Sequence, residues 1–222
     1  MAGAAGARRG SSVRSYIVIE GPIGVGKTTL ARRLARSYDA ELLLEAPQDN
    51  PFLSRFYENP AAHALATQLF FLLQRVEQLR VLHQGDLFAP MRIGDYLLAK
   101  DRLFAELTLR ADELTLYDQL HQKLAEALPP PDLVVYLQAP VSVLRERIAR
   151  RGIDYEQRID TSYLQRLVDA YTRFFHAYER TPLLIVNAAS IDVVNNESHY
   201  LALREQIEAT HSGRTFFNLI GD

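Results

Sequence analysis

The segment 21–28 has the residue types and the spacing of a phosphate-binding loop. It reads GPIGVGKT and matches the pattern G-x-x-x-x-G-K-[ST]. Its glycines let backbone N–H groups turn toward an anion, and a helix that begins after them adds the favourable end of its dipole. We expect Lys27 to reach the outer phosphates of ATP and Thr28 to place its hydroxyl on Mg²⁺. The residues predicted to bind ATP here are Gly21, Gly24, Val25, Gly26, Lys27, Thr28 and Thr29.

Two carboxylates, Glu45 and Asp95, follow short apolar runs that are expected to be strands. Ligands bind at the carboxyl ends of parallel strands, so both acids should face the loop. Two carboxylates that face a phosphate suggest one general base and one metal partner. The sequence has no N-K-x-D motif for guanine, and its strongest later strand ends in Gln138 rather than in an acid. A kinase is therefore favoured over a GTPase or a hydrolysing ATPase.

These residues need a framework in which strands alternate with helices. The apolar runs are short and continuous, a pattern typical of strands buried on both faces. The predicted strands are 16–20, 42–44, 91–94, 133–137 and 183–186. The predicted helices are 27–38, 60–82, a stretch that ends at 109, 112–128, 141–150, 161–178 and 197–209. We expect a three-layer α/β fold of the P-loop NTPase type, with a five-stranded parallel sheet and helices on both faces.

Composition limits the number of domains and the class of partner. The 222 residues suffice for one core, and we expect one kinase domain at 15–222 after a disordered tail at 1–14. The net charge of -2 offers no basic field for nucleic acid, and no apolar run approaches the roughly 20 residues that cross a membrane. The absence of cysteine fits a cytoplasmic protein. The tail contains arginine and serine but no acid, so a cleaved organellar address stays open as an alternative.

Several longer segments follow one another along residues 15–207. They are GPIGVGKTTL, LLLEAPQDNPFLSRFYENP, TQLFFLLQR, DYLLAKDRLFA, VYLQAPVSVLRERIARRG and YEQRIDTSYL. In this order they resemble the deoxynucleoside kinase family, particularly its bacterial members related to deoxyadenosine, deoxyguanosine and deoxycytidine kinases. The resemblance implies transfer of the γ-phosphate of ATP to the 5′-hydroxyl of a deoxynucleoside in nucleotide salvage, with a purine preferred. It also implies a homodimer built from helices.

The resemblance assigns roles on the acceptor side. Glu45 matches the glutamate that activates the 5′-hydroxyl, and Gln68 matches the glutamine that pairs with the base edge. Arg75 lies two helical turns after Gln68 and matches the arginine that fixes a base-contacting aspartate, here Asp101. The residues that match the groups holding the 3′-hydroxyl are Tyr57 and Glu156.

On the donor side, the family has a lid of arginines that closes over the transferring phosphate, and the residues that match it are Arg147, Arg150 and Arg151. Positive charge is expected there because phosphoryl transfer gains most of its acceleration from positioning and from nearby cations. Arg150 is assigned to ATP binding, and Asp192 matches a loop that meets the adenine. The predicted catalytic residues are Glu45, Lys27, Arg147 and Arg151, and the predicted metal ligands are Thr28 and Asp95.

Two positions depart from the family pattern. Tyr96 stands directly after Asp95, where the family usually has an arginine, and a tyrosine cannot hold a positive charge. Ile153 stands where a further lid arginine is common. One phosphate contact is therefore unassigned, and Arg92 or a lid arginine is expected to supply it.

Simpler alternatives exist for each assignment and for the whole chain. Solvated acids and surface ion pairs are common, and basic residues complement the end of any helix. Asp192 could equally form a plain turn. Phe70, Phe71 and Phe104 are expected to pack in the core, and contact with a base is the alternative for Phe104, which follows Asp101 by about one helical turn. The alternative functions are a nucleoside monophosphate kinase of the thymidylate kinase type and a regulatory module that binds ATP without catalysis.

Overall fold

Six parallel strands form the central sheet in the described part of the chain. The computed structural model describes residues 14–83, 90–125, 128 and 130–219. The strands are β1 (Tyr16–Glu20), β2 (Glu41–Leu43), β3 (Arg92–Gly94), β4 (Leu133–Gln138), β5 (Leu183–Asn187) and β6 (Arg214–Phe217). Their order is β2-β3-β1-β4-β5-β6, and every neighbouring pair is parallel. The carboxyl ends of β1, β2 and β3 therefore meet at one edge of the sheet.

The expectation of a five-stranded sheet is wrong by one strand. The additional strand, β6, pairs in parallel with β5 and lies at the edge of the sheet. It has only four residues, and Phe216 in it is 68% exposed. A short edge strand with an apolar side chain in solvent lacks the continuous buried run on which the other predictions depended. The predicted tail at 1–14 lies outside the described residues except for Arg14.

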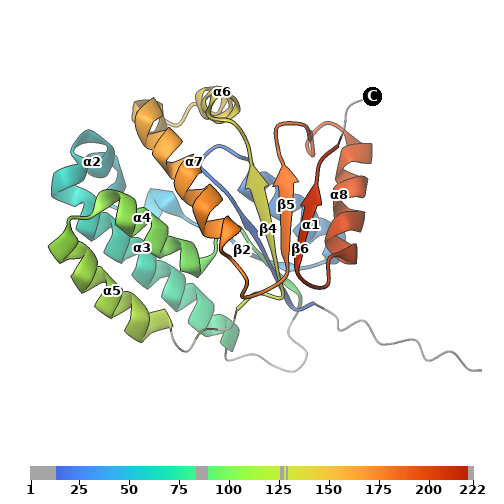
Figure 1. Cartoon of the computed structure of the whole chain (residues 1–222), viewed down its shortest axis with the longest axis horizontal. Helices are drawn as coiled ribbons and strands as arrows, with labels where there is room; N and C mark the ends of the chain where they lie inside the picture. Colours follow the sequence, from blue (N-terminus) through green and yellow to red (C-terminus); the bar gives the residue numbers. More distant parts are fainter. Residues whose placement is uncertain (1–13, 84–89, 126–127, 129, 220–222) are drawn as a thin grey trace, which may run out of the picture.

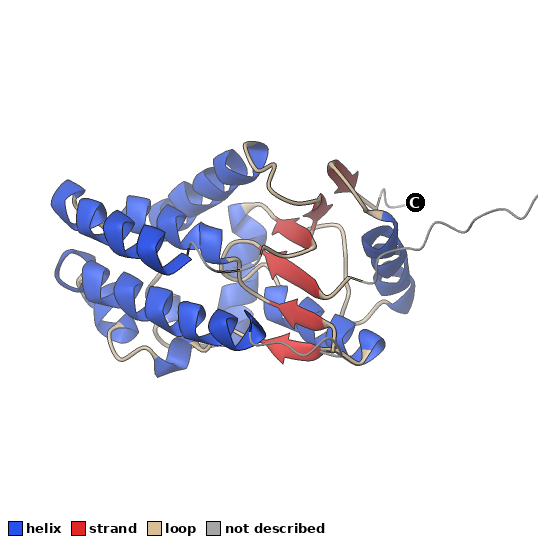
Figure 2. Ribbon diagram, turned by 90° about the horizontal axis from the view of Figure 1, so that it is seen from below, coloured by secondary structure: helices blue, strands red, loops and turns tan. Residues whose placement is uncertain are grey.

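Helices lie on both sides of the sheet (Figures 1 and 2), which confirms the three-layer expectation. They are α1 (Lys27–Tyr38), α2 (Leu53–Glu58), α3 (Pro60–His83), α4 (Asp101–Thr108), α5 (Ala111–Ala125), α6 (Val141–Arg151), α7 (Thr161–His176) and α8 (Glu197–Ala209). Short 3₁₀ turns are η1 (Pro47–Asp49), η2 (Leu98–Lys100) and η3 (Glu156–Arg158). Within the described residues, no helix combines the length and the apolar character needed to cross a membrane.

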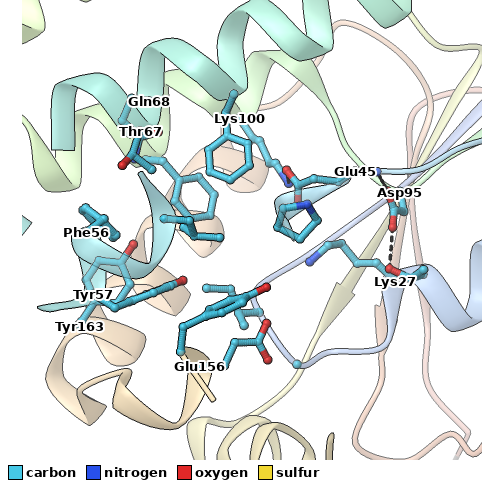
Figure 3. Close-up of a pocket in the computed structure, with 18 of the residues that line it drawn as sticks. Lys27, Glu45, Phe56, Tyr57, Thr67, Gln68, Asp95, Lys100, Glu156 and Tyr163 are labelled. Atoms are coloured by element: carbon cyan, nitrogen blue, oxygen red, sulfur yellow. Dashed lines mark hydrogen bonds and ion pairs between the residues drawn. The ribbon is translucent and has the colours of Figure 1, made fainter. Parts of the chain in front are cut away.

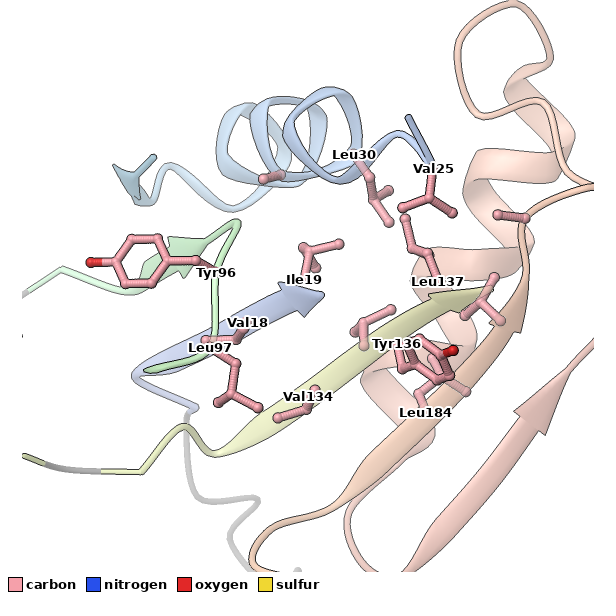
Figure 4. Close-up of a cluster of buried hydrophobic side chains, with 14 of the residues drawn as sticks. Val18, Ile19, Val25, Leu30, Tyr96, Leu97, Val134, Tyr136, Leu137 and Leu184 are labelled. Atoms are coloured by element: carbon pink, nitrogen blue, oxygen red, sulfur yellow. The ribbon is translucent and has the colours of Figure 1, made fainter. Parts of the chain in front are cut away.

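The core packs the sheet against α1 and against the loop that precedes it. Figure 4 shows Ile19 of β1 and Leu137 of β4 beside Val25 and Leu30. Val25 belongs to the phosphate-binding loop and is buried, so the loop is anchored in the core by one of its own side chains. On the α7 side, the Tyr136 ring stacks on Phe175 with 4.1 Å between centroids. The position of the loop is therefore set by packing as well as by its glycines.

Leu184→Ala in β5 should lower the free energy of unfolding by about 2–5 kcal/mol. Leu184 is 0% exposed, so the truncation removes buried apolar surface and leaves a space that its neighbours cannot fully close. The control is Leu201→Ala on α8, because Leu201 is 43% exposed and its loss should cost under about 1 kcal/mol. Urea unfolding measures both changes. Equal losses in the two variants would contradict the placement of Leu184 in the core.

Candidate active site

The phosphate-binding loop is held in one conformation by its glycines and by its lysine. Gly24 and Gly26 have φ values of 83° and 106°, a region that favours glycine. A side chain at Gly24 would also place its Cβ 2.8 Å from Cγ1 of Ile148 in α6. The Nζ of Lys27 donates to the carbonyl oxygen of Gly21 at 2.6 Å. The ammonium thus lies over the loop beside the N-terminus of α1, where an anion is favoured.

Asp95 connects the loop to the ends of two neighbouring strands. Thr28 Oγ1 donates to Asp95 Oδ2 at 2.5 Å, and the backbone N–H of Glu45 donates to Asp95 Oδ1 at 2.7 Å. Hydroxyl and carboxylate oxygens are ligands that Mg²⁺ prefers, so Thr28 and Asp95 fit a magnesium position. Among the described residues, no three His, Asp or Glu side chains cluster closely enough to hold a metal. Phosphate and water oxygens would therefore complete the coordination.

Arg75 of α3 bridges two of the acids predicted for the acceptor side. Its terminal nitrogens donate to Asp101 of α4 and to Glu45 after β2. Arg75 and Asp101 are both buried. Burial raises the pKa of the Asp101 carboxyl, and the charge of Arg75 opposes that rise. The structure thus brings Arg75 and Asp101 together, as the sequence indicated, and adds a contact with Glu45 that the sequence did not indicate.

A cavity opens between α3, the η3 region and the phosphate-binding loop (Figure 3). Gln68 donates to Thr108 Oγ1 at 3.3 Å on one wall. Burial raises the pKa of the Tyr57 hydroxyl well above its ordinary value, so this group stays protonated and can donate. At its inner end the cavity reaches Lys27 and Thr28. The predicted acceptor residues that line it are Glu45, Tyr57, Gln68, Arg75 and Glu156, whereas Asp101 is not on its wall.

Several wall residues were not predicted from the sequence. Phe71 and Phe104 pack against the core, as expected, but they also line this cavity. The alternative of a base contact for Phe104 rested on its spacing of one helical turn after Asp101, and Phe71 follows Gln68 by the same spacing, a signal that was not used. Aromatic faces of this kind can stack on a base. The other unpredicted polar and aromatic wall residues are Phe56, Thr67, Lys100, Tyr155, Tyr163 and Tyr171.

A second cavity lies on the other side of the loop. It is lined by residues 24–30 and 188–195 and by α6, which contributes three arginines. The predicted donor-side residues Arg147, Arg150 and Asp192 all line it. The residues that line both cavities are Gly24, Lys27, Thr28 and Arg151. The two cavities therefore meet at the loop, so a ligand in one can approach a ligand in the other.

Three of the donor-side residues also make local contacts. Arg147 donates to the carbonyl oxygens of Val25 at 2.9 Å and of Ala188 at 2.8 Å, and so braces the loop. Arg151 Nε donates to Glu156 Oε2 at 2.9 Å. Asp192 accepts the backbone N–H of Asn195 at 2.9 Å, and this bond contributes most to lowering its pKa. Asp192 is thus a turn-forming residue on the cavity wall.

The two departures from the family pattern have different surroundings. Tyr96 is fully buried, and its hydroxyl has no hydrogen-bond partner among the described residues. Ile153 precedes η3, and its carbonyl oxygen accepts the N–H of Glu156 at 3.0 Å. Arg92, one of the expected substitutes, donates to Glu41 Oε2 at 3.0 Å and is not on the described wall of either cavity.

The fold and the site together define a P-loop phosphotransferase, with a phosphate-binding loop between two cavities at the carboxyl edge of a parallel sheet. Residues 17–211 match the sequence model of the family described as deoxynucleoside kinase. Deoxyguanosine kinase of Bacillus subtilis (strain 168) is 36% identical over 194 residues, which cover 83% of this chain and 92% of that relative. The deoxyadenosine/deoxycytidine kinase of the same strain is 27% identical over 202 residues, covering 87% and 91%.

The fold has a counterpart among solved structures. The deoxyadenosine kinase from M. mycoides with bound dCTP superimposes with a TM-score of 0.76 at 22% identity and covers 87% of this chain and 99% of that one. The chain belongs to the deoxynucleoside kinase family, and it is a kinase. The regulatory module without catalysis is thereby set aside.

Arg75→Ala should lower the free energy of unfolding by about 3–5 kcal/mol, because it leaves the buried charge of Asp101 without its partner. The control is Arg102→Ala, which removes an arginine that pairs with Asp118 and Glu106 at a half-exposed position. That change should cost under about 1 kcal/mol. Urea unfolding at neutral pH compares the two. An equal loss of unfolding free energy in both variants would show that the contacts of Arg75 stabilise the fold no more than an exposed ion pair does.

ATP binding should weaken above pH about 8. Burial, and then the nearby charge of Lys100, lowers the pKa of Lys27 to about 8. In the free protein, Lys27 is charged below that pH and loses its proton above it, so the ATP dissociation constant should rise about tenfold for each further pH unit. Lys27→Arg stays charged and should remove this dependence. Calorimetric titration across this range tests the effect, and an identical pH profile for both proteins would refute it.

Proposed function

We propose that this kinase transfers the γ-phosphate of ATP to the 5′-hydroxyl of a deoxynucleoside in nucleotide salvage, and that it prefers a purine. The observation that best supports this proposal is that the two cavities meet at Lys27, Thr28 and Arg151. One cavity adjoins the phosphate-binding loop and the α6 arginines, and the other has an acid, an amide and aromatic rings on its walls. The names of the relatives, deoxyguanosine kinase and deoxyadenosine/deoxycytidine kinase, support a purine acceptor.

On the donor side, the loop amides and Lys27 bind the phosphates of ATP. The amides are those of the loop residues Gly21, Gly24, Val25, Gly26, Thr28 and Thr29. Thr28 and Asp95 would hold Mg²⁺, which would offset the negative charge of the phosphates when bound. Arg150 and Arg151 reach the phosphates from α6, while Arg147 holds the loop in place through Val25. Asp192 lies near the adenine.

On the acceptor side, Glu45 takes the proton of the 5′-hydroxyl as the oxygen attacks phosphorus. Arg75 orients the Glu45 carboxylate because it is itself fixed by Asp101. Tyr57 and Glu156 hold the 3′-hydroxyl, with the first as a donor and the second as an acceptor. Gln68 pairs with the edge of the base, and Phe104 lines the same cavity.

The surroundings of the acceptor disfavour a nucleoside monophosphate kinase. Such an enzyme needs free cations to receive a second phosphate. In this cavity, Arg75 is paired with Glu45 and Asp101, and Arg151 is paired with Glu156. The single kinase domain at 15–222, the homodimer and the cytoplasmic location stay predictions.

Glu45→Gln should reduce kcat by about 10²–10⁴-fold, because the amide cannot accept the proton. The dissociation constant for ATP should stay unchanged. The control is Glu41→Gln, which alters an exposed acid that pairs with Arg92. The assay measures phosphotransfer from Mg-ATP to the four deoxynucleosides, their ribose counterparts and their monophosphates. Near-normal turnover by Glu45→Gln would remove Glu45 from the role of base, and a monophosphate as the best acceptor would overturn the proposed function.

A further inference from the structure

Lys100 is a buried cation that has no role in the proposed function. It is the last residue of η2, directly before α4, and it is 2% exposed. Its side chain nevertheless lies on the wall of the cavity between α3, the η3 region and the phosphate-binding loop (Figure 3). We call this space the acceptor cavity, because the proposed function places the deoxynucleoside there. Burying an ammonium group costs several kcal/mol unless other charges and hydrogen bonds compensate. The groups around Lys100 therefore indicate the role of its positive charge.

Two carboxylates lie close to the Lys100 ammonium. Its Nζ is 3.3 Å from Glu20 Oε1 and 3.9 Å from Glu45 Oε1. The ammonium is also 5.7 Å from the ring centre of Phe104, on the same cavity wall. Lys100 thus lies between a fully buried acid at the end of β1 and the proposed base.

Glu20 does not depend on Lys100 for its hydrogen bonds. It accepts from the N–H of Leu97 at 2.7 Å, from the N–H of Gly21 at 2.8 Å and from the hydroxyl of Tyr171 at 3.0 Å. The contact with Lys100, at 3.3 Å, is longer than any of these three. An ammonium carries three donors, and Glu20 uses one of them. The other donors of Lys100 are free to serve Glu45 and a ligand in the cavity.

The position of Lys27 provides a second observation. Lys27 and Lys100 both line the acceptor cavity, and Lys27 also lines the second cavity. Two ammonium groups on the wall of one cavity favour an anionic ligand there.

The position after Asp95 cannot supply this acceptor-side charge. Tyr96 there is neutral and fully buried, and burial raises its pKa, so it carries no charge at neutral pH. Arg92 pairs with Glu41 instead. Among the cations on the described wall of the acceptor cavity, Arg75 donates to Glu45 and Lys27 lies over the phosphate-binding loop. Lys100 lies beside the proposed base and uses one of its three donors on Glu20.

We propose that Lys100 is a catalytic residue that contacts the transferring phosphoryl group from the acceptor side, opposite Lys27; this proposal rests on the proposed function. In the reaction, a bond forms between the 5′-oxygen and the γ-phosphorus, and the bond from that phosphorus to the β,γ-bridging oxygen breaks. The electron pair of the broken bond leaves with ADP, and the 5′-hydroxyl proton goes to Glu45. Lys100 keeps its protons throughout and donates to a phosphoryl oxygen, whose charge is spread in the transition state.

The test replaces Lys100 by a side chain of similar length without charge. Lys100→Met should lower kcat by about 10²–10³-fold and leave the deoxynucleoside KM and the ATP dissociation constant within about threefold. Lys100→Arg, which keeps the charge, should recover a large part of the lost kcat. The control is Lys123→Met, at an exposed position on α5, which should behave as wild type. Wild-type kcat in Lys100→Met would overturn the proposal.

A second variant separates catalysis from support of the fold. Lys100→Met leaves the buried Glu20 charge without a counter-charge, which alone could destabilise the protein. The double variant Glu20→Gln/Lys100→Met removes both charges and should recover thermal stability, while its kcat stays about 10²–10³-fold low. Recovery of kcat together with stability would show that Lys100 only neutralises Glu20. If the wild type phosphorylates no deoxynucleoside, the proposed function fails, whereas turnover that is insensitive to Lys100 overturns only this inference.

Discussion

The hydrogen bonds of Asp95 are the interaction on which the arrangement of this site depends. One carboxylate accepts the hydroxyl of Thr28, at the start of α1, and the backbone N–H of Glu45, after β2. Asp95 itself directly follows β3. Three segments that are far apart in the sequence are thereby fixed at one edge of a parallel sheet, where ligands bind in folds of this kind. Together with the pairing of β1, β2 and β3, this side chain sets how far the phosphate-binding loop lies from the proposed base.

Behind that edge, buried charges compensate one another. Arg75 is held between Asp101 and Glu45, and Lys100 lies between Glu20 and Glu45. Each of these charges would be costly alone in an interior of low dielectric constant, and each is tolerable because an opposite charge lies beside it. Under the proposed function, the same low dielectric constant would strengthen the action of these groups on a bound phosphate.

Much of this arrangement was predictable from the sequence, and each exception lacks a distinctive local pattern of residues. The loop and five of the six strands are local patterns of glycines or apolar runs, so the sequence predicts them directly. β6 was missed because an exposed edge strand of four residues has no such pattern. The cavity-lining role of Phe71 was missed, and that of Phe104 was only an alternative to core packing, because an aromatic residue on a helix has the same spacing whether it faces the core or a cavity. Lys100 was missed because lysine is almost always exposed.

The sequence by itself determined the phosphate-binding chemistry, the alternation of strands and helices, and the acids at the strand ends, because each depends on residues close together in the chain. The pairing of Arg75 with Asp101 was expected from the resemblance, but only the tertiary structure decided which other charges lie beside them. The contact of Arg75 with Glu45 spans 30 positions, and that of Lys100 with Glu20 spans 80. Such contacts depend on how helices pack on the sheet, and no local pattern encodes that packing.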